Sequence, residues 1–287
     1  MPLLHEFLDA GGRFSRILRH SPGPKRRALF LACLKLELKY WLLVRLLRRR
    51  ITHETLFRFD IEFFNYETFR ILFGEIFVTD VYLFPASCPT PLIIDGGANI
   101  GMSVLYFKYI YPASHIVAFE PDPRTFEMLR RNVEKNGLTN VQIHNVALQA
   151  TAGTTTLYYT ANSPGWLCQS IMRGMAPKGQ DETVAAAALS DYIFSGVELL
   201  KMDIEGAETP VVSELAGSGK LAYVQRIVLE YHHHIDRDND IAGEFLSTLE
   251  RNGFGYQLSA PLRPPFPERE LQFFFIYAYR KEAFVKA

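Results

Sequence analysis

The sequence "LIIDGGANIGMSV" (residues 92–104) places an aspartate and three glycines between an apolar run and a segment of helical character. The pattern predicts a buried strand over 91–95, a turn, and a helix over 101–111 that ends before Pro112. The turn does not match a dinucleotide-binding pattern, since Asn99 stands where the middle glycine would fall, and it lacks the lysine of a phosphate-binding loop. A pyrophosphate would also lie near the Asp95 carboxylate, which is unfavourable. The turn must therefore suit another ligand.

Outward from this turn, apolar runs alternate with amphipathic segments. Helices are expected over 121–137, with Asp122 as N-cap and Pro123 in the first position, then around Pro210, and from about 241 to Gly253. The expected strands are 91–95, 115–120, 141–148, 154–160 (a hairpin candidate), 197–203, 223–230, 254–260 and 271–280, and the polar segment 161–182 reads as a loop. This alternation predicts an α/β fold with a mostly parallel sheet and helices on both faces.

Polar residues fall at or near the ends of five expected strands: Asp95, Glu120, Asn145, Asp203 and Glu230. The carboxyl ends of parallel strands meet at one edge of a sheet, where ligands bind. There, Glu120 would accept hydrogen bonds from ribose hydroxyls, and the carboxylates would favour a cationic centre. S-adenosylmethionine combines a ribose, an ammonium group and a sulfonium, so the pattern suits this cofactor.

Composition bounds the class of protein. Lys+Arg and Asp+Glu both number 31 in 287 residues, and this balance argues against a general nucleic-acid binder. Residues 1–50 nevertheless hold 12 Lys/Arg and 3 Asp/Glu. Three isolated cysteines favour a reducing, cytoplasmic setting, and we expect neither a signal peptide nor a transmembrane segment, because charges interrupt the apolar run 28–47.

Five motifs carry a resemblance to a known family: "IIDGGANIGMS", "VAFEPDP", "NVAL", "LLKMDIEGAE" and "IVLEYH". In this order and at these distances they resemble the FkbM-type family of S-adenosylmethionine-dependent methyltransferases, over roughly Leu92 to Phe254. The resemblance implies a class I methyltransferase (Rossmann-like) fold, a seven-stranded sheet whose last strand is antiparallel. It divides the chain into an N-terminal basic and apolar helical arm, residues 1–80, and a methyltransferase domain, residues 81–287.

The resemblance also implies a cofactor site. Gly97 and Gly101 would let the backbone approach the donor, and Asp95 would anchor its amino end directly or through water. Asp122 would either lie near the adenine edge or simply cap its helix. The cofactor-binding residues implied are Asp95, Gly96, Gly97, Asn99, Gly101, Glu120, Pro121, Asp122, Asn145, Val146, Ala147 and Ser170.

A second set of polar residues follows two later strands. Asp203 is expected to face the transferred methyl group, while Glu208 also fits ordinary helix-start electrostatics. Lys201 should share a strand face with Asp203, which leaves a buried Lys–Asp pair open. The histidines of "EYHHHI" form either a solvated loop or, through His232 or His234, a general base. The candidate catalytic residues are Asp203, Glu205 and His232.

The sequence therefore predicts methyl transfer to a hydroxyl of a small molecule, natural product or sugar. N-methylation and a non-catalytic scaffold that binds S-adenosylmethionine remain alternatives. We expect no metal ligands, and Mg²⁺ held by Asp203 and Glu230 is the less favoured mechanism. The loop 161–182 would close over the donor, and the arm would be buried against the domain or a second copy, or contact a membrane surface.

Overall fold

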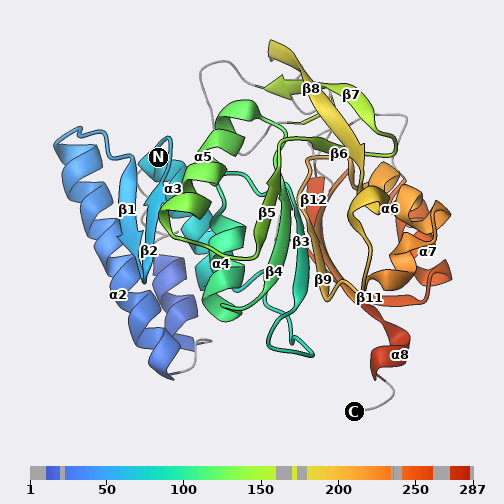
Figure 1. Cartoon of the computed structure of the whole chain (residues 1–287). Helices are drawn as coiled ribbons and strands as arrows, with labels where there is room; N and C mark the ends of the chain where they lie inside the picture. Colours follow the sequence, from blue (N-terminus) through green and yellow to red (C-terminus); the bar gives the residue numbers. More distant parts are fainter. Residues whose placement is uncertain are drawn as a thin grey trace.

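A seven-stranded sheet lies at the centre of the computed structural model, which describes residues 11–19, 23–159, 170–172, 180–233, 235, 241–260 and 272–284 (Figure 1). Its strands run in the order β11 (Phe254–Ser259), β12 (Gln272–Arg280), β10 (Arg226–His233), β9 (Leu199–Met202), β3 (Leu92–Gly96), β4 (His115–Phe119) and β5 (Val141–His144). Only β12 pairs antiparallel with its neighbours in this sheet, and the other pairs are parallel. The predicted mostly parallel sheet with an antiparallel last strand is confirmed.

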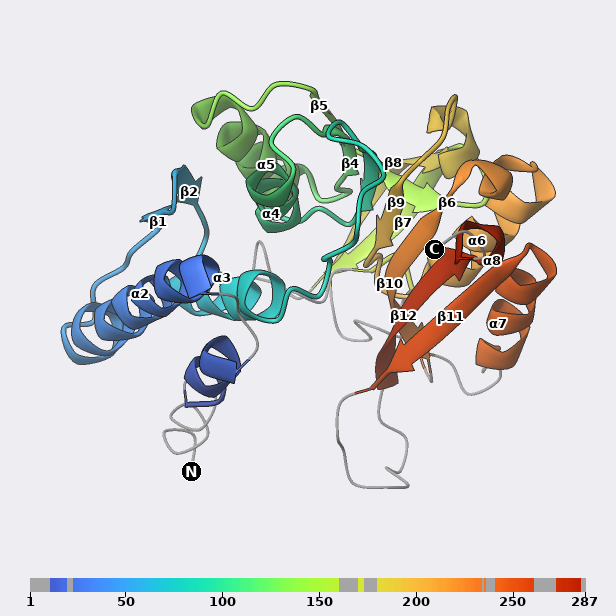
Figure 2. The same cartoon turned by 90° about the horizontal axis from the view of Figure 1, so that it is seen from below.

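Helices cover both faces of this sheet (Figure 2). On one face lie α4 (Met102–Ile110) and α5 (Pro123–Lys135), and on the other α6 (Glu208–Gly217) and α7 (Ala242–Arg251). Asp122 caps α5 by accepting from the backbone N–H of Arg124 at 3.0 Å, and Pro123 stands at its start. Each face has its own apolar core, because α4 and α5 pack with the arm while α6 and α7 pack with η4 (Leu189–Tyr192) and η5 (Lys220–Tyr223).

The arm consists of helices and one hairpin. A helix over 11–19 precedes α2 (Gly23–Lys39), which continues as the π-helical η1 (Tyr40–Leu46), and α3 (Tyr66–Phe73) runs on into η2 (Gly74–Val78). Between them β1 (His53–Leu56) and β2 (Phe59–Glu62) form an antiparallel hairpin, which the sequence did not predict. Apolar residues of the arm and of α4 belong to one continuous core, and the division at residue 80 stays a prediction.

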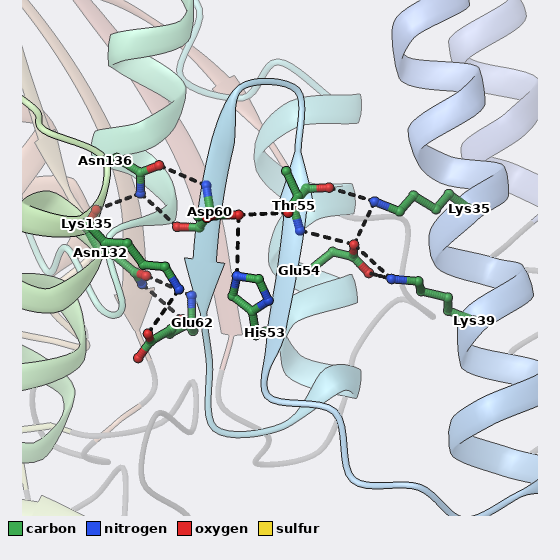
Figure 3. A network of polar contacts seen from close by, with 10 residues as sticks. All are labelled: Lys35, Lys39, His53, Glu54, Thr55, Asp60, Glu62, Asn132, Lys135 and Asn136. Carbon is green, nitrogen blue, oxygen red and sulfur yellow. Dashed lines mark hydrogen bonds and ion pairs between the residues drawn. The ribbon is translucent and has the colours of Figure 1, made fainter.

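Two asparagines, one in α5 and one at its C-terminal end, bind the hairpin to the domain (Figure 3). Asn132 accepts from the backbone N–H of Glu62 at 2.8 Å and donates to its carbonyl at 2.9 Å. Asn136 makes the same pair of bonds with Asp60, both at 2.8 Å. On the other side of the hairpin, buried Glu54 pairs with Lys35 and Lys39 of α2 at 2.7 and 2.8 Å. The amides satisfy the free edge of β2, so the arm is held to the domain through backbone groups.

Two predicted strands differ from the structure, and one further strand was not predicted. The strand expected over 141–148 breaks at Asn145, and its second half, β6 (Ala147–Gln149), leaves the main sheet to pair with β8 (Gln180–Ala188). The predicted hairpin strand forms as β7 (Gly153–Tyr159) and pairs antiparallel with β8, which the sequence did not predict. Strand β10 continues to His233, beyond the expected end at residue 230. A short helix α8 (Lys281–Phe284) follows β12. Within the described ranges, no helix is long and apolar enough to cross a membrane.

Candidate active site

A pocket of about 740 Å³ opens at the carboxyl ends of β3, β4, β9 and β10. Its walls come from the glycine turn, from the ends of these strands, from β6 and β12, and from the arm. The residues used below that line it are Glu75, Tyr82, Gly97, Asn99, Glu120, Pro121, Val146, Ala147, Lys201, Asp203, Glu205, Glu230 and His232. This places the site at the predicted edge of the sheet and gives it the size of a small-molecule pocket.

The glycine turn is packed directly against the end of β9. Gly97 has φ +76°, and a Cβ there would lie 1.8 Å from the carbonyl oxygen of Asp203, so no side chain fits. Asn99 is also left-handed, with φ +50°, and Gly101 follows with φ +95°. The Nζ of Lys201 donates to the carbonyls of Gly96 and Gly97 at 3.0 and 2.6 Å. These contacts fix the shape of the turn, and the absence of a side chain at Gly97 lets a ligand approach its main chain.

Asp95 supports this turn from beneath rather than lining the pocket. It is fully buried, accepts from the Ser103 hydroxyl at 2.6 Å, and lies 3.0 Å from the Nζ of Lys201. The ion pair between Asp95 and Lys201 follows from strand register, because the two residues lie opposite each other on β3 and β9. The Lys201–Asp203 pair that the sequence left open does not form, since Lys201 pairs with Asp95 instead.

Glu120 lies at the pocket wall with its carboxylate held by two backbone amides. Oε2 accepts from Asn99 N–H at 2.9 Å, and Oε1 accepts from Asp122 N–H at 3.0 Å. Burial raises the pKa of Glu120 to about 8, while the hydrogen bond from Asp122 opposes this shift and the negative charge of Asp122 adds to it. The carboxylate is thus fixed in position, with lone pairs left for hydroxyl donors.

Of the other cofactor-binding candidates, three line the pocket and three hold the neighbouring backbone in place. Pro121, Val146 and Ala147 line the pocket. Asn145 donates to the carbonyls of Glu120 and Pro121 at 2.8 and 3.0 Å, so it fixes the corner between β5 and β6. Ser170 is buried and donates to the Glu205 carbonyl, while Asp122, also buried, caps α5. Of the two roles that the sequence left open for Asp122, the structure shows the helix cap.

At the opposite end of the pocket, carboxylates surround one histidine. The Nδ1 of His232 lies 3.3 Å from Glu208, and its Nε2 lies 3.4 Å from Glu205 and 3.5 Å from Glu230. Glu208 in turn accepts from the backbone N–H of Gly206 at 3.1 Å. His232 is buried within β10, which corrects the alternative of a solvated histidine loop, while His234 lies outside the described residues.

The ionisable groups of this cluster change one another's pKa values. Burial alone would lower the pKa of His232, but its hydrogen bond with Glu208 and the surrounding carboxylates outweigh burial and raise it to about 10. Burial and the charge of Asp203 raise the pKa of Glu230 to about 8, against the opposing effect of His232, and burial with Asp203 also raises that of Glu205. The cluster therefore gathers acidic side chains around one imidazolium, and burial favours the protonated forms of Glu205 and Glu230.

Comparison with known proteins identifies the family. A model described as "Methyltransferase FkbM domain" matches residues 95–256, more than half of the chain. The chain belongs to this family. Methyltransferase 1 of Beauveria bassiana (strain ARSEF 2860) is 29% identical over 229 residues, covering 72% of this chain and 88% of that protein. The 31-O-demethyl-FK506 methyltransferase FkbM of Streptomyces tacrolimicus is 24% identical over 217 residues, covering 64% and 81%.

Among solved structures, methyltransferase FkbM from Methylobacillus flagellatus KT is similar at 16% identity and a TM-score of 0.44. The match covers 75% of this chain and 54% of that one, so this chain spans about half the length of that protein. The chain is a member of the FkbM methyltransferase family, and its sheet has the mostly parallel order and the single antiparallel strand expected of the class I methyltransferase fold.

The arm, which lies outside the FkbM domain match, supplies part of the pocket wall. Glu75 of η2 lines the pocket, although much of this residue is exposed to solvent. Tyr82, just beyond the arm, also lines the pocket, with its ring centroid 5.5 Å from the Nζ of Lys201. Sequence reasoning missed both residues, because no motif connects them to the glycine turn. The only available signal was an acidic residue inside an otherwise apolar segment, "GEIFV".

Within the described residues, one group of side chains has the composition of a metal site. Asp203, Glu205 and His232 each offer one ligand atom, and these atoms lie within 4.8 Å of one another. Carboxylate oxygens with one imidazole would suit a divalent cation. The same three residues are the predicted catalytic group, so metal binding and proton transfer are competing uses of one cluster.

Proposed function

We propose that this FkbM domain transfers a methyl group from S-adenosylmethionine to a hydroxyl oxygen of a small molecule, such as a natural product or a sugar. One observation carries the proposal. A single pocket joins Glu120 and the side-chain-free turn at Gly97 to the Asp203–Glu205–His232 cluster. One end suits a nucleoside with a cationic tail, and the other suits an acceptor that must lose a proton.

The assignment of one end of the pocket to the donor rests on the hydrogen bonds that Glu120 can accept. Both oxygens of Glu120 are anchored by backbone amides, which leaves the carboxylate oriented to accept from the two ribose hydroxyls. Val146 and Ala147 offer an apolar wall for the adenine. Gly97, with no Cβ, admits the methionine portion, and the negative cluster beyond it favours the sulfonium.

The acceptor end follows from the protonation of the cluster. With a pKa of about 10, His232 is an imidazolium near neutral pH and cannot take a proton, so its proposed role is to orient Glu205 and Glu230. A carboxylate, Asp203 or Glu205, would accept the hydroxyl proton as the oxygen attacks the methyl carbon. The O–CH₃ bond forms, the S–CH₃ bond breaks, and S-adenosylhomocysteine leaves. Alignment of the two reactants would supply much of the acceleration.

N-methylation is the second candidate, because an acidic pocket attracts protonated amines. An ammonium has no free lone pair, however, so it too must first give up its proton to the cluster. Incubation with labelled S-adenosylmethionine and a library of alcohols and amines tests both, with the methylated atom identified by NMR. Calorimetry completes the test: tighter binding of NAD than of S-adenosylhomocysteine would contradict the donor assignment, and tight binding without turnover would favour a scaffold.

A further inference from the structure

The outward side of α2, η1 and the following loop has an unusual composition. Among residues 25–50, every exposed residue is a leucine, an arginine or a lysine: Arg26, Arg27, Leu31, Leu34, Lys35, Leu38, Leu42, Arg45, Leu46, Leu47, Arg48, Arg49 and Arg50. The only acidic residue in this range, Glu37, is buried and paired with Arg70 at 2.9 Å and Arg13 at 2.5 Å. This basic leucine face, as we call these thirteen residues, therefore carries positive charge without exposed negative charge.

The leucines form a continuous stripe along the helix. Leu31, Leu34, Leu38 and Leu42 are spaced three and four residues apart, which places them on one side. Leu31 is 64% exposed, Leu38 is 61% and Leu46 is 71%. The opposite side, with Leu29, Cys33, Leu36 and Tyr40, is buried against the rest of the arm. The helix thus has two apolar sides, and the described part of the chain covers only one of them.

The position of α2 leaves this face open. Figures 1 and 2 show α2 at the outer edge of the molecule, farther from the central sheet than α3 and the hairpin. The sequence favoured burial of the arm against the domain or a second copy, and the structure buries one side. A contiguous exposed apolar stripe is rare on the surface of a monomeric protein and marks an interaction site.

We propose that the basic leucine face docks onto an anionic lipid bilayer surface. Leucines at the boundary of the acyl chains, with Arg and Lys beside them at headgroup level, match the pattern of helices that lie in a membrane interface. Long basic side chains reach the headgroups while their stems cover apolar surface. A two-fold dimer through the same face would instead set the basic side chains of one copy against those of the other, which is repulsive. Charge therefore selects an anionic occupant.

Flotation with phosphatidylcholine vesicles, with and without phosphatidylglycerol, tests this proposal independently of methyl transfer. The whole chain should float with the anionic vesicles and stay behind with the neutral ones. Replacing Arg48, Arg49 and Arg50 with glutamine should weaken binding about a hundredfold, since each basic residue near an anionic surface contributes about fivefold. The double variant Leu31→Ser/Leu38→Ser should weaken it by roughly tenfold or more.

Phe194→Ser is the matched control, because Phe194 is 82% exposed and lies outside the arm. It should float like the wild type. All variants should keep the wild-type melting temperature and affinity for S-adenosylhomocysteine, since the substituted residues are exposed and outside the pocket. Absence of vesicle binding, or equal binding of neutral and anionic vesicles, would overturn the proposal. So would a concentration-dependent dimer that the leucine variant abolishes while flotation is unchanged.

Discussion

Replacing Glu120 with glutamine should change two measurable properties: the pH dependence of the unfolding free energy and the affinity for S-adenosylhomocysteine. In the folded protein, burial raises the pKa of Glu120 from 4.5 to about 8, whereas the unfolded chain should keep the ordinary value. The folded state therefore holds a proton that the unfolded state has already released, and stability falls as pH rises between these two values. At about 1.4 kcal/mol per pKa unit, the loss between pH 4.5 and neutrality is about 3 kcal/mol.

Glutamine cannot ionise, so the variant lacks this contribution. Its amide group must face one of the N–H donors of Asn99 or Asp122, which costs the variant about 1–3 kcal/mol at every pH. The difference in unfolding free energy between variant and wild type should therefore shift by about 3 kcal/mol in favour of the variant as pH rises towards neutrality. Above the pKa of about 8, where the wild-type Glu120 is ionised, affinity for S-adenosylhomocysteine should fall about 5- to 150-fold in the variant, because a charge-assisted bond to the ribose is lost.

Urea unfolding from pH 4.5 to pH 8 measures the first effect, and calorimetry measures the second. Glu127→Gln is the matched control, since Glu127 is a partly exposed carboxylate of α5 that pairs with Arg130. This control should preserve the pH slope of the wild type and its affinity for the donor product. Parallel stability curves for Glu120→Gln and the wild type, together with unchanged affinity, would refute the reasoning.

Four further results are expected. Gly97→Ala should abolish binding of S-adenosylhomocysteine and lower the melting temperature, because the added Cβ would overlap the Asp203 carbonyl; a normal melt with normal binding would contradict the turn geometry. Asp203→Asn should reduce turnover roughly a hundredfold or more while donor affinity stays within a few-fold, and full activity would remove Asp203 from the catalytic group. Initial rates should persist in excess EDTA; a loss that Mg²⁺ restores would assign the Asp203–Glu205–His232 cluster to a metal. Removing residues 1–50 should expose apolar surface and shift the elution volume on size exclusion, and an active, monomeric truncation would show that this segment is dispensable.

The glycine turn and the Glu120 wall could be predicted from sequence because their chemistry is local. Gly97 stands where only a residue without Cβ fits, and Gly101 has a left-handed backbone that favours glycine. Glu120 directly follows β4, which pairs with the strand that precedes the turn. The pattern of apolar runs likewise gave the order of most elements. These features depend on neighbours in the chain, which a single sequence displays.

Other features depend on register and on distant segments. Lys201 pairs with Asp95 because their strands align opposite each other, and no local pattern displays that alignment. His232 is buried because β10 extends to pair with β12, which places it opposite Phe273. Glu75 reaches the pocket only because the arm packs on α4, from a segment beyond the recognisable motifs. In each case the decisive contact joins residues far apart in the chain.

The contact between Gly97 and the Asp203 carbonyl has a consequence for how acceptor range can change. The glycine turn after β3 packs backbone to backbone against the segment that begins at Asp203. Lys201 also holds the turn, through its hydrogen bond to the Gly97 carbonyl. In the proposed reaction, the spacing between the donor's methyl group and the proton acceptor would thus depend mainly on the main chain, whereas the pocket wall at Glu75 and Tyr82 is made of side chains from a separate segment. Substitutions in that segment can reshape the chamber for a new acceptor without disturbing the line of attack. Related enzymes could therefore differ in the acceptor that they select while they keep the same arrangement of donor and proton acceptor.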